Sequence, residues 1–308
     1  MAEVHQLGYW SALLLPVVLL ALALVASAAD AVAAAVAAGR PARTGALEPV
    51  RAAVRLGLTQ RRTVAVPDSL LWRFGGGGVL VVAVLATAVV PLGSWVVSDP
   101  PVGIVWWSAL LAVLWALLHM LGYSPDAGLP LVGGYRFLAQ AMAYEMPLAI
   151  SVICTGLAAE SLRVGDVVAA QHGLWFAVWM PGAFVVFLVC GLAVSFYGPF
   201  STPTAAALGG GLLAESSGVD RLVVLVGRYL VLASVAGFGA TIFLGGGDGP
   251  VLPPAVWTVV KSLALLGVLV LARWRCAHVR PERFEEIGWV VLLPVSVLQA
   301  LVVSLVVL

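Results

Sequence analysis

Three polar side chains interrupt one apolar segment of the chain and are the first candidates for chemistry. Arg136, Gln140 and Glu145 follow one another at intervals of four and five residues, which places them near one face of a helix. Pro147 comes shortly after them and frees backbone groups nearby. An ionisable group at membrane depth normally faces a cavity or a partner. The pattern favours a polar cavity around Glu145, and a structural ion pair is the alternative.

Four other ionisable residues lie inside apolar segments: Asp30, His119, Arg228 and Lys261. Asp30 lies where a broken or tilted first helix would expose it to water, which makes it a second candidate for a proton path. Arg228 and Lys261 have long side chains that can extend to the membrane interface. The simpler interpretation is that their charged ends reach water there and have no further role.

The sequence contains no recognisable set of cofactor ligands. There is no glycine-rich phosphate loop and no histidine pair at ligand spacing, and Cys154, Cys190 and Cys276 form no CxxC pair. We therefore expect this chain to bind no metal and no redox cofactor. In a redox reaction it would supply a wall for a lipid-soluble substrate and a docking face for a soluble electron-carrying subunit.

Composition predicts an all-α integral membrane protein with a single polytopic domain over residues 1–308. The chain is 62% hydrophobic and only 10% charged, with a mean hydropathy of +1.08, whereas soluble domains carry roughly 25% charged residues. Its net charge of +1, without a long run of like charge, gives no indication of a nucleic-acid partner. Since a spanning helix needs about 20 apolar residues, we expect eight spans, at 11–38, 75–92, 103–122, 134–159, 174–194, 221–244, 255–273 and 287–307.

The distribution of basic residues predicts the orientation in the membrane. Seven arginines fall between Arg40 and Arg73 and four between Arg273 and Arg283, so that with Arg136 and Arg221 the side reached after the first helix holds 13 of the 16 Lys and Arg. Cytoplasmic loops carry the excess of basic residues. This side is therefore predicted to be cytoplasmic, with both termini outside.

Two connecting segments differ from ordinary turns. Between the first two spans, Val50, Val54 and Leu58 alternate with Arg51 and Arg55 at helical spacing, which predicts a basic amphipathic helix. It either lies against anionic lipid or caps a cavity between helices.

The second segment, residues 192–218, carries Pro199, Pro203 and three consecutive glycines between two predicted spans. We expect it to form a loop at the membrane surface, which is either functional or a flexible connector.

These features together resemble the eight-helix membrane subunit of respiratory complex I that borders the quinone chamber, which is the H-type subunit of bacterial NADH-quinone oxidoreductases and the homologue of mitochondrial subunit 1. The resemblance covers nearly the whole chain. It rests on Arg43-Thr44-Gly45, Leu47-Glu48-Pro49 and Arg55-Leu56; on Arg136, Ala139-Gln140 and Ala143-Tyr144-Glu145-Met146-Pro147-Leu148; on Pro199-Phe200-Ser201-Thr202-Pro203 and Glu215-Ser216-Ser217-Gly218; on Thr241-Ile242-Phe243-Leu244-Gly245-Gly246; and on Leu252-Pro253, Trp257, Lys261, Arg273-Trp274, Gly288-Trp289 and Leu292-Leu293-Pro294.

The resemblance implies a bacterial cell-membrane subunit that links the peripheral electron-carrying arm of a proton-translocating complex to its membrane arm. Quinone would be the substrate, and NADH, FMN and the iron–sulfur clusters would be bound by partner subunits. Glu145 would be the catalytic residue. The implied quinone-chamber residues are Arg43, Arg51, Arg55, Arg136, Gln140, Tyr144 and Phe200. The implied proton-path residues are Glu145, Asp30 and Glu215.

The chain departs from this family in the loop after the fifth span, where the family is acidic. Here the corresponding residues are Val194, Tyr197, Ser201, Thr204, Ala205, Ala206 and Ala207. An alanine cannot hold a proton, so the resemblance implies a divergent copy with altered coupling. The alternatives are a non-catalytic scaffold of a variant complex, the membrane subunit of a related membrane-bound hydrogenase, and an autonomous transporter; the absence of internal repeats argues against the transporter.

Overall fold

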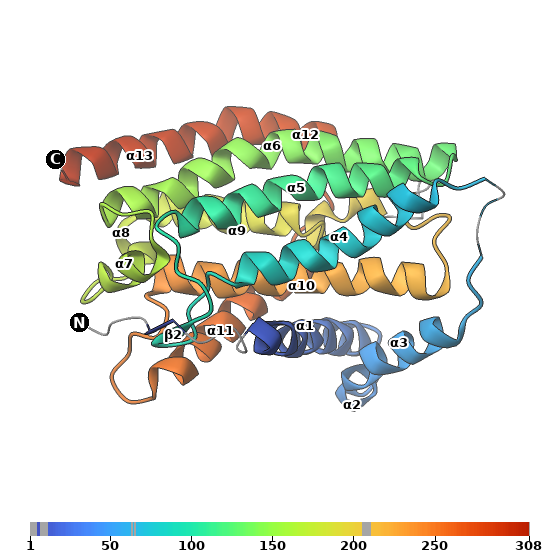
Figure 1. Cartoon of the computed structure of the whole chain (residues 1–308), viewed down its shortest axis with the longest axis horizontal. Coiled ribbons are helices and arrows are strands. Elements are labelled where there is room, and N and C mark those ends of the chain that lie inside the picture. Colours follow the sequence, from blue (N-terminus) through green and yellow to red (C-terminus); the bar gives the residue numbers. More distant parts are fainter. Residues whose placement is uncertain (1–4, 7–11, 63, 65, 205–210, 308) are drawn as a thin grey trace.

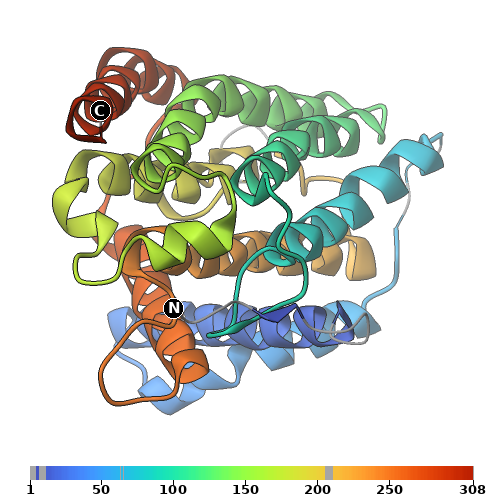
Figure 2. The same cartoon turned by 60° about the vertical axis from the view of Figure 1, so that its left-hand side comes forward.

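Long apolar helices form almost the entire molecule (Figures 1 and 2). The computed structural model describes residues 5–6, 12–62, 64, 66–204 and 211–307. In these, seven helices are long and apolar enough to cross a membrane: α1 (Leu14–Ala37), α4 (Ser69–Thr87), α5 (Gly103–Tyr123), α6 (Gly128–Ala158), α10 (Gly218–Leu244), α11 (Pro254–Arg275) and the C-terminal helix Pro281–Val307. The last comprises α12 (Pro281–Ile287), a π-helical turn (Gly288–Leu292) and α13 (Leu293–Val307). The all-α membrane fold is therefore confirmed.

Helix α10 is the central element of the bundle. It is buried along most of its length and packs against α1, α4, α9 and α11. Its Phe238 ring stacks on Trp107 of α5 with the ring centroids 4.1 Å apart. The ring centroids of Phe243 and of Phe187 in α9 are 5.2 Å apart. The helix ends at Gly245, whose left-handed backbone (φ 69°) terminates helices at low steric cost. A polar side chain on α10 is therefore held in a fixed position.

The fifth crossing is broken, which corrects the prediction of one continuous helix over 174–194. The chain forms α8 (Phe176–Trp179), turns at Met180 and continues as α9 (Pro181–Val194). Pro181 has no N–H to continue a helix from α8 but suits the first turn of α9. The 14 residues of α9 extend about 21 Å, less than the ~30 Å of a bilayer's hydrocarbon core.

The first part of the segment after α9 is enclosed by other parts of the protein and does not form an exposed connector. Residues 192–200 are all buried, and two 3₁₀ turns follow at Gly198–Phe200 and Thr202–Thr204. Irregular backbone is tolerated at membrane depth where protein surrounds it. Gln140 of α6 satisfies the end of α9 by donating to the Ala193 carbonyl at 2.6 Å, and Pro199 accepts from the Val279 amide at 3.0 Å. The predicted Ala205–Ala207 part lies outside the described residues.

The predicted amphipathic helix is present as α3 (Glu48–Leu58), preceded by the short α2 (Ala42–Ala46). Gly45 lets α2 approach α1 closely, because a Cβ at this position would lie 2.5 Å from the Ala31 carbonyl oxygen. Beyond α3, Arg61 pairs with Asp220 at 2.7 Å and the Arg62 amide donates to Ser217 Oγ at 2.7 Å. These contacts fix α3 at both ends against α1 and α10.

The remaining elements lie on one side of the bundle. Helix α7 (Val164–Ala169) follows α6, and two short parallel strands, β1 (His5–Gln6) and β2 (Trp95–Val96), pair the start of the chain with the loop between α4 and α5. That loop is reached after two crossings. The start of the chain therefore lies on the same side of the bundle as this loop.

A substitution at Gly45 tests how α3 is positioned. We expect Gly45→Ala to move α2 away from α1 and to lower stability by about 1–3 kcal/mol, because the added Cβ has no space. Gly57→Ala in α3 is the matched control, since nothing lies within 4 Å of its Cβ. Thermal unfolding in detergent and the rate of tryptic cleavage after Arg43 measure both effects. Equal behaviour of the two variants would contradict this packing.

Candidate functional site

A cavity of about 380 Å³ lies between α1, α3 and α10. Its walls are largely aliphatic, with Leu20, Ala23 and Leu24 from α1 and Leu222, Leu225 and Val226 from α10. Helix α3 covers it with the face that carries Ala52, Ala53 and Leu56. Leu20 and Leu24 are each 44% exposed, so the apolar wall continues onto the lipid-facing side of α1.

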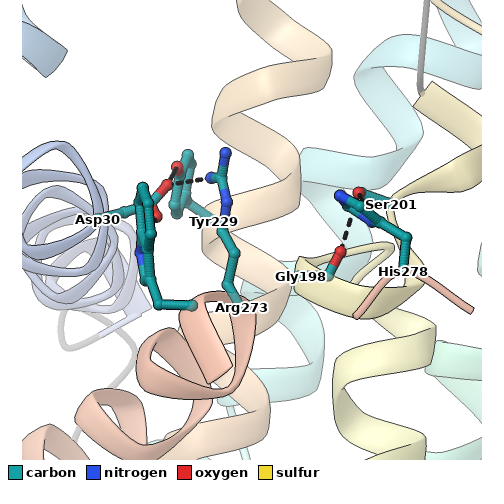
Figure 3. Close-up of polar contacts among 7 residues, drawn as sticks. Asp30, Gly198, Ser201, Tyr229, Arg273 and His278 are labelled. Atoms are coloured by element: carbon teal, nitrogen blue, oxygen red, sulfur yellow. Dashed lines mark hydrogen bonds and ion pairs between the residues drawn. The ribbon is translucent and has the colours of Figure 1, made fainter. Parts of the chain in front are cut away.

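Polar groups gather in one part of this cavity, around Asp30 of α1 (Figure 3). Asp30 is 6% exposed. One carboxylate oxygen, Oδ2, accepts a hydrogen bond from the Tyr229 hydroxyl at 2.8 Å and pairs with the Arg273 guanidinium; the other, Oδ1, accepts from Trp274 Nε1 at 3.2 Å. Both oxygens are thus satisfied, and the cluster connects α1, α10 and α11.

A second guanidinium, that of Arg228, lines the same cavity. It lies 4.8 Å from the ring centroid of Tyr197, in the irregular segment after α9. Arg228 Nε and the Tyr197 hydroxyl are both buried and have no hydrogen-bond partner among the described residues. An aliphatic cavity with a few convergent polar groups is the usual form of a site for an amphipathic small molecule.

The two faces of α3 differ in what they contact. Arg51 and Arg55 lie with Val50, Val54 and Leu58 on the face that does not line the cavity. Arg55 approaches Glu48 at 3.5 Å, but both side chains are well exposed, so this pair adds little stability. The arginines that the sequence singled out in α3 therefore point away from the cavity that α3 covers.

A separate hollow of about 260 Å³ lies between α5 and α6 and contains Glu145. Val105, Ser108 and Ala112 of α5 face Tyr144, Glu145 and Leu148 of α6 across it. Glu145 is half-buried, and the Tyr144 hydroxyl is buried without a partner in the described part of the chain. Glu145 therefore lies at an aliphatic hollow with few other polar groups.

The structure does not bring the predicted chamber residues into one cavity. None of Arg43, Arg51, Arg55, Arg136, Gln140, Tyr144 and Phe200 lines the space between α1, α3 and α10. Phe200 is buried against Phe284 with the ring centroids 4.4 Å apart, and Gln140 holds the end of α9. Glu215 is half-buried in the turn before α10. Their individual roles remain predictions.

Two other ionisable residues inside apolar segments have partners within the protein. Helix α1 is unbroken around Asp30, whose carboxylate pairs with Arg273. Lys261 is 5% exposed, and its ammonium donates to the carbonyls of Leu244 and Asp248 at 2.6 Å each. The last carbonyls of α10 lack helical partners, and Lys261 supplies a donor to them.

Sequence reasoning missed Tyr229 and Arg273 as site residues and gave Arg228 no role. Arg273 was used as a cytoplasmic marker and, with Trp274, as part of the family resemblance, but it was not assigned to the site. The one available signal was an arginine, Arg228, in the middle of an apolar segment.

Ser201 occupies a position at which the resembled family is acidic. Its hydroxyl donates to the Gly198 carbonyl at 2.9 Å and lies 3.4 Å from His278 Nδ1 (Figure 3). A serine here maintains local hydrogen bonds without a charge.

Comparison with known proteins gives a consistent result. The sequence profile described as NADH dehydrogenase matches residues 10–304. The second H-type subunit of the NADH-quinone oxidoreductase of Geobacter sulfurreducens is 33% identical over 269 residues, covering 84% of this chain and 82% of that protein. The first H-type subunit of the Geobacter metallireducens enzyme is 32% identical with the same coverage. The second H-type subunit of the Cereibacter sphaeroides enzyme is 35% identical over 68% of this chain and 66% of that protein.

Removing the Asp30 carboxylate tests the polar cluster. We expect Asp30→Asn to lower stability by about 2–3 kcal/mol, below the ~3–5 kcal/mol of a fully buried pair because the Arg273 side chain is 38% exposed. Glu48→Gln, which breaks the exposed pair with Arg55, is the matched control and should cost less than about 1 kcal/mol. Thermal unfolding of the detergent-solubilised protein measures both. An Asp30→Asn variant as stable as Glu48→Gln would show that the cluster does not hold the helices together.

Proposed function

The chain belongs to the NADH dehydrogenase family, and from this premise we propose that it is the membrane subunit of a proton-translocating NADH-quinone oxidoreductase that admits quinone from the bilayer. Its relatives are named as the H-type subunit of that enzyme. In this role it links the peripheral electron-carrying arm to the membrane arm. NADH, FMN and the iron–sulfur clusters belong to partner subunits, and quinone is the substrate that reaches this chain.

The cavity between α1, α3 and α10 is the observation that supports this proposal most directly. A quinone has an apolar tail and a head with two carbonyl oxygens. The tail requires an aliphatic path from lipid, which Leu20 and Leu24 supply. The head requires a small number of donors, which Arg228 and the remaining N–H groups of Arg273 supply. We place the quinone entrance here, with α3 as its outer wall.

The peripheral arm binds on the side of α3, in this proposal. The exposed Arg51 and Arg55 on the outer face of α3 are available to a partner subunit or to anionic headgroups. The basic loops then face the cytoplasm, and both termini lie outside. Helix α13 ends on the same side of the bundle as the β1–β2 pair (Figure 1), and this supports an even number of passes.

For proton movement we assign the main role to Glu145. Its carboxylate belongs to the spanning helix α6 and lines the hollow between α5 and α6, which is separate from the Asp30–Arg273 ion pair. Asp30 is bonded through both oxygens, so a proton reaches it only if Arg273 moves away. Glu215 would receive protons from the cytoplasmic side, at the start of α10.

A non-catalytic scaffold is the second candidate. The observation in its favour is the loss of charge after α9, where Val194 and Tyr197 are buried and Ser201 bonds locally. In that case the cavity would be a remnant that lipid fills, and the chain would only anchor the peripheral arm.

Blocking the cavity separates these two functions. We expect Ala53→Trp, on the cavity face of α3, to lower the rate with a long-chain isoprenoid quinone about tenfold, or ~1.4 kcal/mol. The rate with ferricyanide, which takes electrons from the peripheral arm, should not change. Val54→Trp on the exposed face is the matched control. Unchanged quinone reduction in an assembled Ala53→Trp complex would place the entrance elsewhere.

Glu145→Gln tests the proton path, because an amide cannot hold and release the proton. We expect quinone reduction to continue while proton translocation per electron pair falls by at least half. A pH-sensitive dye in sealed vesicles measures translocation. Glu160→Gln, an exposed acid after α6, is the control. Unchanged pumping and quinone reduction would remove Glu145 from the mechanism and favour the scaffold.

A further inference from the structure

We propose that the cavity between α1, α3 and α10 also binds a single-chain amphiphile with an anionic head group, a long-chain carboxylate, whose charge is held by Arg228. This ligand uses the space assigned above to quinone. Its binding does not depend on quinone passing through, so either proposal can fail without the other.

One of the two guanidinium groups at the polar end of the cavity has no ion-pair partner among the described residues. Two guanidinium groups, those of Arg228 and Arg273, face one carboxylate, that of Asp30. Asp30 is fully occupied by Arg273, Tyr229 and Trp274. The other acid on the wall, Glu48, approaches Arg55 outside the cavity. A neutral quinone would leave Arg228 without a counter-charge.

Arg228 is the group that lacks a partner. Among the described residues it makes no hydrogen bond or ion pair, and its Nε is buried. The Tyr197 ring, 4.8 Å away, holds the guanidinium by a cation–π contact but accepts none of its directed hydrogen bonds. A guanidinium with a buried Nε that lacks an acceptor is costly, and a planar carboxylate satisfies two of its donors at once. The geometry therefore favours an anionic ligand over a neutral one.

The shape of the cavity favours one alkyl chain over two. Its volume of about 380 Å³ is near the lower end of ligand pockets, which range over roughly 300–1,000 Å³. Leu24, Leu222 and Leu225 form an aliphatic wall beside Arg228. A single chain lies along this wall and continues past the exposed Leu20 into lipid, whereas the second chain of a phospholipid has no matching space.

Binding of radiolabelled oleate to the assembled complex in nanodiscs of neutral phosphatidylcholine tests the proposal. Oleyl alcohol has the same chain without the charge. We expect the wild type to bind oleate at least tenfold more tightly than oleyl alcohol. Arg228→Gln should lose this preference, while Arg73→Gln, at an exposed arginine of α4, should keep it. Equal affinities of the two ligands for the wild type, or a preference that survives Arg228→Gln, would overturn the proposal.

Two further measurements locate the ligand and identify its class. Ala53→Trp should weaken binding of both oleate and oleyl alcohol. This variant also tests the proposal if the Arg228→Gln complex does not assemble. Unchanged binding of both ligands would overturn the assignment to this cavity. Acetate and inorganic phosphate should not displace oleate, because the site needs the chain. Displacement by either, or by equimolar phosphatidylglycerol, would contradict a single-chain site.

Discussion

The ion pair between Asp30 and Arg273 is the contact on which the arrangement of α1, α10 and α11 depends. It joins residues 243 positions apart in the chain, and Tyr229 and Trp274 complete the coordination of the same carboxylate. Helix α1 is otherwise held mainly by aliphatic contacts, which in a bilayer provide little driving force for helix association. An ion pair with a buried carboxylate defines one register of α1 against its neighbours and thereby defines the cavity between them.

The broken fifth crossing is the second constraint. Because α9 stops at Val194, inside the protein, the following backbone must find partners among side chains and other loops. Gln140 and Val279 provide two of them. The break also places Tyr197 beneath Arg228, so the irregular segment forms part of the support of the cavity. A continuous helix would carry its polar groups internally and could not present Tyr197 in this way.

Composition and hydropathy predicted the long helices well, because twenty apolar residues in sequence have few alternatives to a spanning helix. The amphipathic α3 was predicted from the helical spacing of Val50, Val54 and Leu58. The break at Pro181 was not predicted, because the segment is apolar throughout and a proline inside a helix can kink it without ending it. Burial of residues 192–200 likewise depends on contacts with α6 and α11 that no local pattern encodes.

The candidate site was predicted only in part. Glu145 and Asp30 were identified because a carboxylate inside an apolar segment is conspicuous. Their surroundings were not, since the partners of Asp30 lie in α10 and α11, about 200 residues or more away. The sequence of α3 predicts a basic amphipathic helix. Only the packing of α3 on α1 and α10 shows which of its faces covers the cavity.

Photoaffinity labelling with an azido-quinone, followed by peptide mapping of the assembled complex, tests the central claim that quinone enters between α1, α3 and α10. The account predicts adducts on residues 48–56 of α3 and 222–229 of α10, with labelling suppressed by excess unmodified quinone. Specific labelling confined to α5 and α6, or to partner subunits alone, would contradict it.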